Sequence, residues 1–219
     1  MAMREKEKST GVIFVRHGKP DFPHDRLYCD EREDPVLTED GHGQARAAAD
    51  LLRMENVDVI YVSPMQRTLM TAEPIVKAMN VPMHTDARLK ERPFGIWDGM
   101  YFEDIRRDYP EDFLAWKQNP VTFVPEGGEP ITDHQKRITD AVREIVARHP
   151  AELIVIVMHV GPIRMCVTEA MQMPLSAYRQ LTVDYGSLTR IDYGKKQDNL
   201  IYLNRKPAFE GGDPCLAQI

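Results

Sequence analysis

The sequence predicts an α/β fold, a three-layer α/β/α sandwich in which helices cover both faces of a mostly parallel central sheet. Three observations predict it. Short apolar runs alternate along the chain with segments of helical periodicity. The run LIVIVM, residues 153–158, is apolar throughout, as in a strand that is buried on both faces. The 219 residues are 42% hydrophobic and 28% charged, which suits a globular chain with one sizeable core.

The first half of the chain is predicted to contain three strands and two helices. Strands are expected at residues 11–16, 57–62 and 81–85, and helices at about 39–54 and 64–79. Thr38 is the expected N-cap of the first helix, because its hydroxyl can accept a hydrogen bond from a free backbone N–H. Ser63 and Pro64 are expected to cap and begin the second helix. Pro74 is expected to kink that helix or to end it early.

Residues 86–130 interrupt the alternation. This stretch holds both tryptophans and many prolines, glycines and acidic residues. We expect short helices at about 101–108 and 110–118, within a helical lid insertion at about 98–130. The alternation then resumes with a helix at 131–148, a strand at 153–158, a helix that begins near Gly161, and an antiparallel hairpin at 187–193 and 200–203.

Charge and hydropathy exclude several classes of partner. The net charge of -6 gives no general attraction to nucleic acid or to anionic membranes. The longest apolar run, residues 153–158, is much shorter than the ~18 residues that a membrane span needs. Residues 1–10 are charged and lack the apolar segment of a signal peptide, so we expect a disordered tail and a cytoplasmic protein. One domain is expected over residues 11–205, followed by a C-terminal tail at 206–219.

The cysteines and histidines do not form a metal-binding pattern. Cys29, Cys166 and Cys215 are odd in number and far apart, so neither a metal site nor a disulfide framework is expected. Cys166 lies among apolar residues and is expected in the core. The histidines show no HxH or HExxH spacing. We therefore expect no metal and no cofactor.

Polar residues at the ends of the predicted strands indicate a common site. Arg16 and His17 follow the first strand, His159 follows the fourth, and Arg67 lies near the start of the helix after the second. Ligands of such sheets bind beyond the carboxyl ends of the strands, so these side chains can converge. Two guanidiniums and two imidazoles would repel one another without an anion, and the arginine fork fits paired phosphate oxygens. Free N–H groups at a helix start add to this preference.

A phosphate pocket that contains a histidine can carry out covalent chemistry. Neutral imidazole can attack phosphorus and hand on the phosphoryl group, which makes His17 a candidate nucleophile. The departing oxygen then needs a proton donor. Glu91 lies in a loop beside apolar residues such as Phe94, and such neighbours favour a protonated carboxyl. Asp98 or Glu103 could supply the proton instead.

These residues occur in four segments through which the chain resembles the histidine phosphatase superfamily, also called the phosphoglycerate mutase-like family. The segments are VRHG at 15–18, SPMQRTLMTAEPI at 63–75, ERPFGIWDG at 91–99 and HVGPIR at 159–164. Weaker segments of this kind are DPVLTEDGHGQA at 34–45 and PEGGEP at 125–130. The resemblance covers about residues 11–193. It implies that His17 is the nucleophile and that Glu91 is the proton donor. It also implies that Arg16, Arg67 and His159 bind the phosphate.

The chain departs from the family pattern near two of these motifs. Lys19 replaces the usual Glu or Gln, and Pro23 stands where the family often has an asparagine. One phosphate contact is therefore expected to be missing, or to be replaced by Lys19 or Arg26. Val160 replaces the second residue of the usual H-G-G motif, without the loss of a functional side chain.

Other polar and aromatic residues have simpler explanations. Arg67 could pair with Glu73 on its own helix, and both tryptophans are expected to pack in the core. The remaining histidines are expected on the surface, at His24, His42, His84, His134 and His149.

The expected function is that of a metal-independent phosphatase that hydrolyses a small phosphorylated metabolite through a phosphohistidine. The alternative is a 2,3-bisphosphoglycerate-dependent phosphoglycerate mutase, which would need extra cations around a second anionic group. The stretch from Glu91 to Gly128 has more acids than bases, although Arg106 and Arg107 lie there. A catalytically silent phosphate-binding protein ranks last, because all five central residues are present. The sequence indicates neither the substrate nor the oligomeric state.

Overall fold

Six strands form one mostly parallel sheet in the computed structural model, which describes residues 9–27 and 33–208. The strands are β1 (Thr10–Arg16), β2 (Val59–Val62), β3 (Met83–Thr85), β4 (Leu153–Met158), β5 (Leu188–Tyr193) and β6 (Asn199–Arg205), and their order in the sheet is β3–β2–β4–β1–β5–β6. The pairs β1–β4, β2–β4 and β2–β3 are parallel, whereas β5 is antiparallel to both β1 and β6. The expected parallel sheet and C-terminal hairpin are confirmed.

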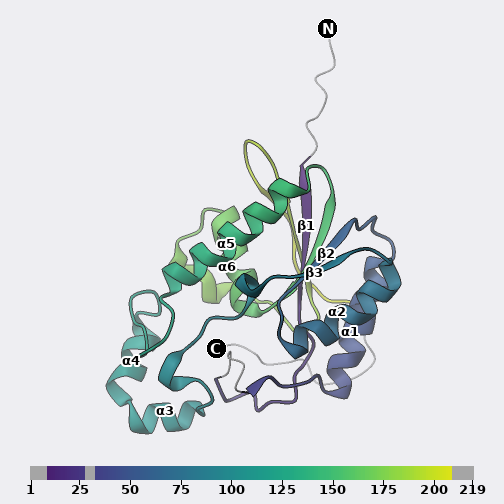
Figure 1. Ribbon diagram of the computed structural model, residues 1–219. Coiled ribbons are helices and arrows are strands. Elements are labelled where there is room, and N and C mark those ends of the chain that lie inside the picture. The colour runs from purple at the N-terminus through teal and green to yellow at the C-terminus, as the bar shows by residue number, and fades with distance from the viewer. Residues whose placement is uncertain (1–8, 28–32, 209–219) are drawn as a thin grey trace.

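Helices cover both faces of this sheet, as Figure 1 shows. The helices of one face are α1 (Glu39–Leu52) and α2 (Gln66–Met79), and those of the other are α5 (Ile131–Arg148) and α6 (Val160–Ala170). Side chains of β1 alternate between the faces: Ile13 and Val15 pack in the cluster under α1 and α2, while Val12 and Phe14 pack in the cluster under α5 and α6. The predicted three-layer arrangement is therefore confirmed.

Two short helices lie apart from both faces of the sheet, at the lower left of Figure 1. They are α3 (Phe102–Asp108) and α4 (Pro110–Gln118). Two 3-10 helices, η2 (Ala87–Leu89) and η3 (Gly95–Trp97), precede them, and a third, η4 (Leu175–Gln180), lies between α6 and β5. Trp97 and Trp116 are buried in a separate apolar cluster with Leu27 and Ile105. The two helices and the packing of the tryptophans are confirmed, and the action of this segment as a lid remains a prediction.

The start of α2 differs from the expectation. Thr38 does cap α1, since its Oγ1 accepts the Gly41 N–H at 3.1 Å. Ser63 and Pro64 do not begin α2, which starts at Gln66. The Ser63 hydroxyl is hydrogen-bonded to His159 instead, and the distant carboxylate of Asp34 accepts the Gln66 N–H at 2.9 Å. A contact between distant segments thus replaces the local cap. The helix also continues past Pro74 to Met79.

Some predictions fall near or beyond the limits of the described residues. Thr10, which was expected in the tail, is the first residue of β1 and is buried. The rest of the predicted N-terminal tail lies outside the described residues except for Ser9, as does most of the predicted C-terminal tail. Cys29 and Cys215 also lie outside them, whereas Cys166 is buried in the core as expected.

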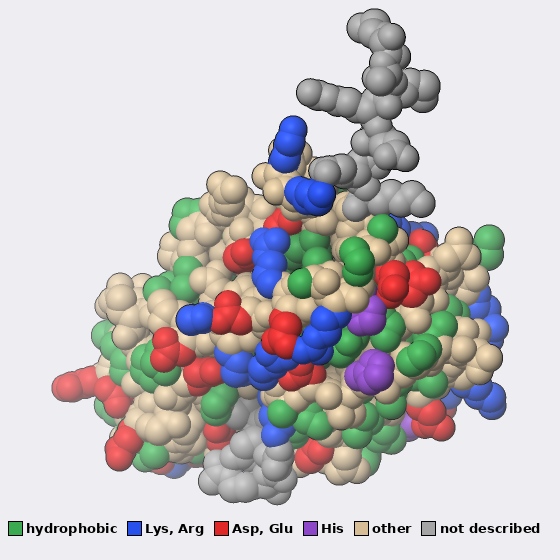
Figure 2. All heavy atoms as spheres, turned by 45° about the horizontal axis from the view of Figure 1, so that its top comes forward, with side chains coloured by type: hydrophobic (Ala, Val, Ile, Leu, Met, Phe, Trp, Pro, Cys, Tyr) green, Lys and Arg blue, Asp and Glu red, His purple; other side chains and the backbone are tan. Residues whose placement is uncertain are grey.

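The surface carries charges of both signs. Figure 2 shows one face of the molecule, on which Lys and Arg side chains lie among Asp and Glu side chains. The described part of the chain also has exposed ion pairs, such as Lys136–Asp140 and Arg46–Glu39. Among residues 9–27 and 33–208, no helix combines the length and the apolar character that crossing a membrane requires.

Candidate active site

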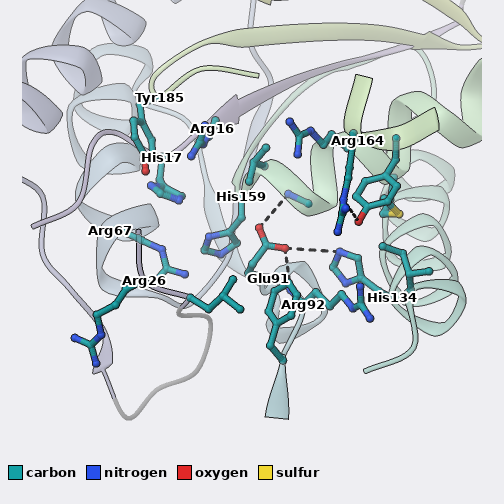
Figure 3. A pocket seen from close by; sticks show the side chains of 18 of the residues that line it. Arg16, His17, Arg26, Arg67, Glu91, Arg92, His134, His159, Arg164 and Tyr185 are labelled. Atoms are coloured by element: carbon teal, nitrogen blue, oxygen red, sulfur yellow. Dashed lines mark hydrogen bonds and ion pairs between the residues drawn. The ribbon is translucent and has the colours of Figure 1, made fainter. Parts of the chain in front are cut away.

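One pocket of about 180 Å³ brings together all five residues that the sequence singled out (Figure 3). Arg16 and His17 lie at the carboxyl end of β1, and His159 directly follows β4. Arg67 lies in the first turn of α2, and Glu91 lies in the loop after η2. The parallel register aligns Arg16 with Met158, so His17 and His159 follow at neighbouring positions. Their ring centroids lie 5.2 Å apart.

Backbone packing determines how His17 leaves the strand. Its N–H donates to the Met158 carbonyl oxygen at 3.0 Å and continues the sheet by one bond. The next residue, Gly18, donates its N–H to Thr71 Oγ1 at 3.0 Å. A Cβ at Gly18 would lie 2.4 Å from the Gly41 carbonyl oxygen, a distance that real Cβ atoms do not adopt. Only glycine therefore allows the chain to turn here against α1.

The surroundings of His17 fix both its tautomer and its charge. Nδ1 lies 2.8 Å from the Gly18 carbonyl oxygen, and a carbonyl can only accept, so Nδ1 carries the proton and Nε2 keeps its lone pair. Burial lowers the pKa of His17 well below its ordinary value, and the charges of Arg67 and Arg16 lower it further, against the opposite effect of the Gly18 carbonyl. The imidazole is therefore neutral at neutral pH.

His159 is also buried and neutral. Its Nε2 lies 2.8 Å from Ser63 Oγ, and its Nδ1 has no hydrogen-bond partner in the part of the chain that the structure describes. Burial is the largest cause that lowers the pKa of His159 well below its ordinary value, followed by the charge of Arg67. A neutral ring with a free nitrogen can donate to, or accept from, a group that binds beside His17.

Two buried guanidiniums make the inner end of the pocket positive. Arg16 Nη1 donates to the Val183 carbonyl oxygen at 2.6 Å, and its Cζ lies 3.7 Å from the centre of the Tyr185 ring. Arg67 Nη1 lies 3.4 Å from Asp34 Oδ1. Asp34 also occupies the N–H of Gln66, so the start of α2 is less free for an anion than the sequence suggested. Buried guanidiniums of this kind suit a phosphate group.

Glu91 is held at the start of α6 by two backbone N–H groups. Its Oε1 accepts the Arg92 N–H at 2.8 Å, and its Oε2 accepts the Gly161 N–H at 3.0 Å. The carboxyl group thus lies against two polar N–H donors, which the sequence did not suggest. The alternative donors do not line the pocket: Asp98 accepts the Phe94 N–H, and Glu103 is exposed on α3. Glu91 is therefore the best-placed of the three carboxyls.

The two residues proposed to replace the missing asparagine contact differ in position. The Lys19 ammonium is exposed, lies 3.3 Å from Asp40 and does not line the pocket. Arg26 does line it, while its Nε donates to the Gly99 carbonyl oxygen at 2.6 Å.

The expectation that His134 lies on the surface is wrong. Its side chain is 1% exposed, its Nδ1 lies 3.1 Å from Glu129 Oε2, and its Nε2 lies 3.8 Å from Glu91 Oε1. The signal was in the sequence, because His134 is three residues after Ile131 and four before Ile138, both on the buried stripe of α5. The pocket thus continues from Glu91 to a buried histidine.

Other pocket residues were also missed. Arg92 and Arg164 belong to the ERPFGIWDG and HVGPIR segments, but nothing in those segments indicates that they line the pocket. Further residues of the same wall are Trp116, Tyr178, Arg179 and Tyr185. These come from α4, from η4 and from the segment before β5, whose approach depends on the fold.

Comparisons with known proteins agree with this geometry. Residues 12–206 match the family model of the histidine phosphatase superfamily (branch 1). Phosphoserine phosphatase 1 of Hydrogenobacter thermophilus is 32% identical over 88% of this chain and 91% of its own length. Adenosylcobalamin/alpha-ribazole phosphatase of Salmonella typhimurium is 28% identical over 89% of this chain and 96% of its own.

A solved structure, that of Bacillus stearothermophilus YhfR, is similar throughout. It has a TM-score of 0.84 and 28% sequence identity, and the match covers 90% of this chain and 98% of that one. Both the family model and these relatives span nearly the whole sheet and the pocket. The chain belongs to the histidine phosphatase superfamily (branch 1).

Proposed function

We propose that this chain is a phosphatase that hydrolyses a phosphate monoester in two steps and carries the phosphoryl group on His17 between them. The observation that supports this most is the state of His17: a neutral ring, with its proton held on Nδ1 by the Gly18 carbonyl, in a pocket with two buried guanidiniums. A nucleophile and the charges that would bind its target thus occur together.

In the first step, the Nε2 lone pair of His17 attacks phosphorus and the ester P–O bond breaks. Arg16, Arg67 and His159 bind the phosphoryl oxygens and stabilise the charge that spreads over them. Glu91, in its protonated form, gives its proton to the departing alkoxide and becomes a carboxylate. The products of the step are an alcohol and a phosphohistidine.

In the second step, water attacks the phosphohistidine. The Glu91 carboxylate takes a proton from this water as its oxygen bonds to phosphorus, and the P–N bond breaks. The electron pair of that bond returns to Nε2 of His17, inorganic phosphate leaves, and Glu91 is protonated again. No metal ion is required at either step, because the positive charge comes from side chains.

Hydrolysis is favoured over phosphoryl return to a sugar acid. Arg106 and Arg107, the arginines that the sequence offered in support of a mutase, do not line the pocket, although Arg92, Arg164 and Arg179 do. Arg107 is instead paired with Asp104 and Asp108 on the exposed side of α3. The relatives named above are phosphatases. Their names suggest small phosphorylated metabolites as the substrate class of this chain.

A panel of phosphate monoesters assayed in EDTA tests the proposal. We expect release of inorganic phosphate, inhibition by vanadate and complete loss in His17→Asn. Glu103→Gln, on the exposed face of α3, is the matched control and should retain activity. Turnover that stops in EDTA and returns with a divalent ion would contradict the mechanism. Interconversion of 2- and 3-phosphoglycerate that depends on added 2,3-bisphosphoglycerate and outpaces phosphate release would identify the mutase instead.

A further inference from the structure

A second group of arginines lines the same pocket beyond Glu91. It consists of Arg92 next to Glu91, Arg164 in α6 and Arg179 in η4. In Figure 3, Arg92 and Arg164 lie on the opposite side of Glu91 from His17 and Arg67. We call Arg92, Arg164 and Arg179 the outer arginine cluster.

These arginines have no ion pair with a carboxylate anywhere in residues 9–27 and 33–208. Each donates its Nε–H to a fixed oxygen, namely the Glu129 carbonyl for Arg92 (2.7 Å), the Leu181 carbonyl for Arg164 (2.8 Å) and the Tyr178 hydroxyl for Arg179 (3.1 Å). Nη2 of Arg92 is buried and has no hydrogen-bond partner in the described part of the chain. The Nε bonds thus orient the side chains and leave the outer N–H groups for a ligand.

Burial makes this arrangement costly for the free protein. Arg92 and Arg164 are only 3% and 6% exposed. Burial is the largest cause that lowers the pKa of Arg92 and of Arg164, and the charge of Arg16 adds to the effect on Arg164, while the charge of Glu91 opposes it at both residues. A guanidinium stays charged in proteins regardless, and buried charges are normally paired. Arg143, which is more exposed, does have a carboxylate partner, since it pairs with Glu169 at 2.8 Å.

The outer cluster is continuous with the phosphoryl pocket. Arg16 and Arg67 line the same pocket as Arg92, Arg164 and Arg179, and the charge of Arg16 acts on Arg164. An apolar wall runs along the same side: the Arg179 guanidinium lies 4.4 Å from the Trp116 ring, and that of Arg92 lies 5.2 Å from the Phe94 ring. One small molecule can therefore meet both ends of the pocket.

We propose that the outer arginine cluster binds a second anionic group, so that the preferred substrates are phosphate monoesters that also carry a carboxylate or another phosphoryl group. The inference rests on the proposed function, since His17 must receive the ester phosphoryl group. The planar fork of arginine binds carboxylate and phosphate in the same bidentate manner, and both are therefore tested.

Two matched pairs of esters provide the test. 3-Phosphoglycerate and glycerol 3-phosphate differ in a carboxylate, while fructose 1,6-bisphosphate and fructose 6-phosphate differ in a second phosphoryl group. We expect kcat/KM to be about 10- to 100-fold higher for the doubly anionic member of at least one pair, as for charge-assisted hydrogen bonds to a buried site. The pair that shows the preference identifies which anion is bound.

Variants then connect the preference to the cluster. In Arg92→Gln and Arg164→Gln, the ratio of kcat/KM within the preferred pair should fall toward unity, and this ratio is insensitive to partial misfolding. Arg179→Gln, at a less buried position, should lower the same ratio. Arg107→Gln, outside the pocket, is the matched control and should keep the wild-type ratio.

Equal kcat/KM within both pairs would overturn the inference and leave the proposed function intact. A preference that survives all three cluster substitutions would also overturn it, because the second anion would then bind elsewhere. Failure to hydrolyse any ester, p-nitrophenyl phosphate included, would overturn the proposed function and this inference with it.

Discussion

His17 and His159 share one pocket, yet their ring nitrogens have different partners. The Gly18 carbonyl oxygen lies 2.8 Å from Nδ1 of His17, whereas Ser63 Oγ lies 2.8 Å from Nε2 of His159. The two rings therefore present different nitrogens to a bound group. His17 presents Nε2, which suits attack on phosphorus, and His159 presents Nδ1, which suits contact with a phosphoryl oxygen.

At the residue scale, we predict that the His17 ring stays neutral at about pH 6, where an ordinary histidine with a pKa near 6.5 is mostly protonated. The reason is the lowering of the His17 pKa by burial and by Arg67 and Arg16. Ring nitrogen NMR in buffer free of phosphate measures it, with His17→Asn to assign the signals. Protonation of both ring nitrogens at about pH 6, or a proton on Nε2 alone, would contradict the prediction.

A second prediction at this scale concerns Glu91. As proton donor, it should matter most when the leaving group is a basic alkoxide. In Glu91→Gln, the rate of phosphorylation by an alkyl phosphate should fall by ~10²–10⁴, about 3–5 kcal/mol of barrier, and much less with p-nitrophenyl phosphate. Single-turnover kinetics are required because Glu91 is proposed to act in the second step as well. Equal losses with both esters would make Glu91 a binding or structural residue.

At the scale of elements, α5 and α6 together hold the Glu91 loop. The first turn of α6 supplies the Gly161 N–H to the carboxylate. Arg137 of α5 donates from Nη1 to the carbonyl oxygens of Arg88 at 2.6 Å and Lys90 at 3.1 Å. Arg137 is itself held by Glu129 at 2.7 Å. The position of Glu91, the proposed proton donor, therefore depends on contacts from both helices.

The close approach of α6 gives a prediction for Gly161→Ala. A Cβ at this position would lie 2.1 Å from Glu91 Oε1, so the carboxylate must move. Misplacement of a catalytic group by about 1 Å can cost about 100-fold, and we expect a loss of that order on alkyl phosphates. The loss on p-nitrophenyl phosphate should be much smaller, as for Glu91→Gln. Activity within about twofold of wild type on alkyl esters would contradict this prediction, because Glu91 would then not need its present position.

The ion pair between Glu129 and Arg137 predicts part of the way in which the free energy of unfolding depends on pH. Burial alone would raise the pKa of Glu129, but hydrogen bonds from Arg137 and His134 outweigh it and lower the pKa to about 2. As the pH falls, Glu129 therefore takes up a proton in the unfolded chain before it does so in the folded protein. The free energy of unfolding falls as the pH falls from about 4.5 to about 2.

Urea unfolding across that pH range measures this contribution. Glu129→Gln should be less stable than wild type at neutral pH and should lack about 1–3 kcal/mol of the acid-dependent loss, since one pKa unit corresponds to about 1.36 kcal/mol. Glu103→Gln is an exposed control and should keep the wild-type pH profile. Identical acid profiles for Glu129→Gln and wild type would contradict the role of this pair.

At the scale of the whole molecule, the parallel sheet gathers a site from segments far apart in the chain. The register of β1 against β4 places His17 beside His159, and α2 after β2 brings Arg67 to the same edge. This part could be predicted from the sequence, because apolar runs fix the strands and polar residues mark their ends. The convergence of Arg16, His17, Arg67 and His159 needed only the rule that parallel strands end on one edge, whereas the place of Glu91 came from the resemblance to the family.

What the sequence did not reveal depends on contacts between distant segments. The cap of α2 comes from Asp34, His134 approaches Glu91 from α5, and the outer arginine cluster combines three separate segments. Local periodicity does not encode such approaches. It does indicate the burial of His134, which lies on the apolar stripe of α5.

If the phosphoryl group passes through His17, it can be trapped there, and trapping it is the most direct measurement. Enzyme mixed with a good substrate is quenched rapidly at alkaline pH, where phosphohistidine survives, and the phosphorylated peptide is located by mass spectrometry. We predict an acid-labile phosphoryl group on His17 that appears within one turnover and is absent in His17→Asn. A phosphoryl group on Ser63, on His159 or on no residue at all, while the enzyme turns over rapidly, would contradict a mechanism through phosphorylated His17.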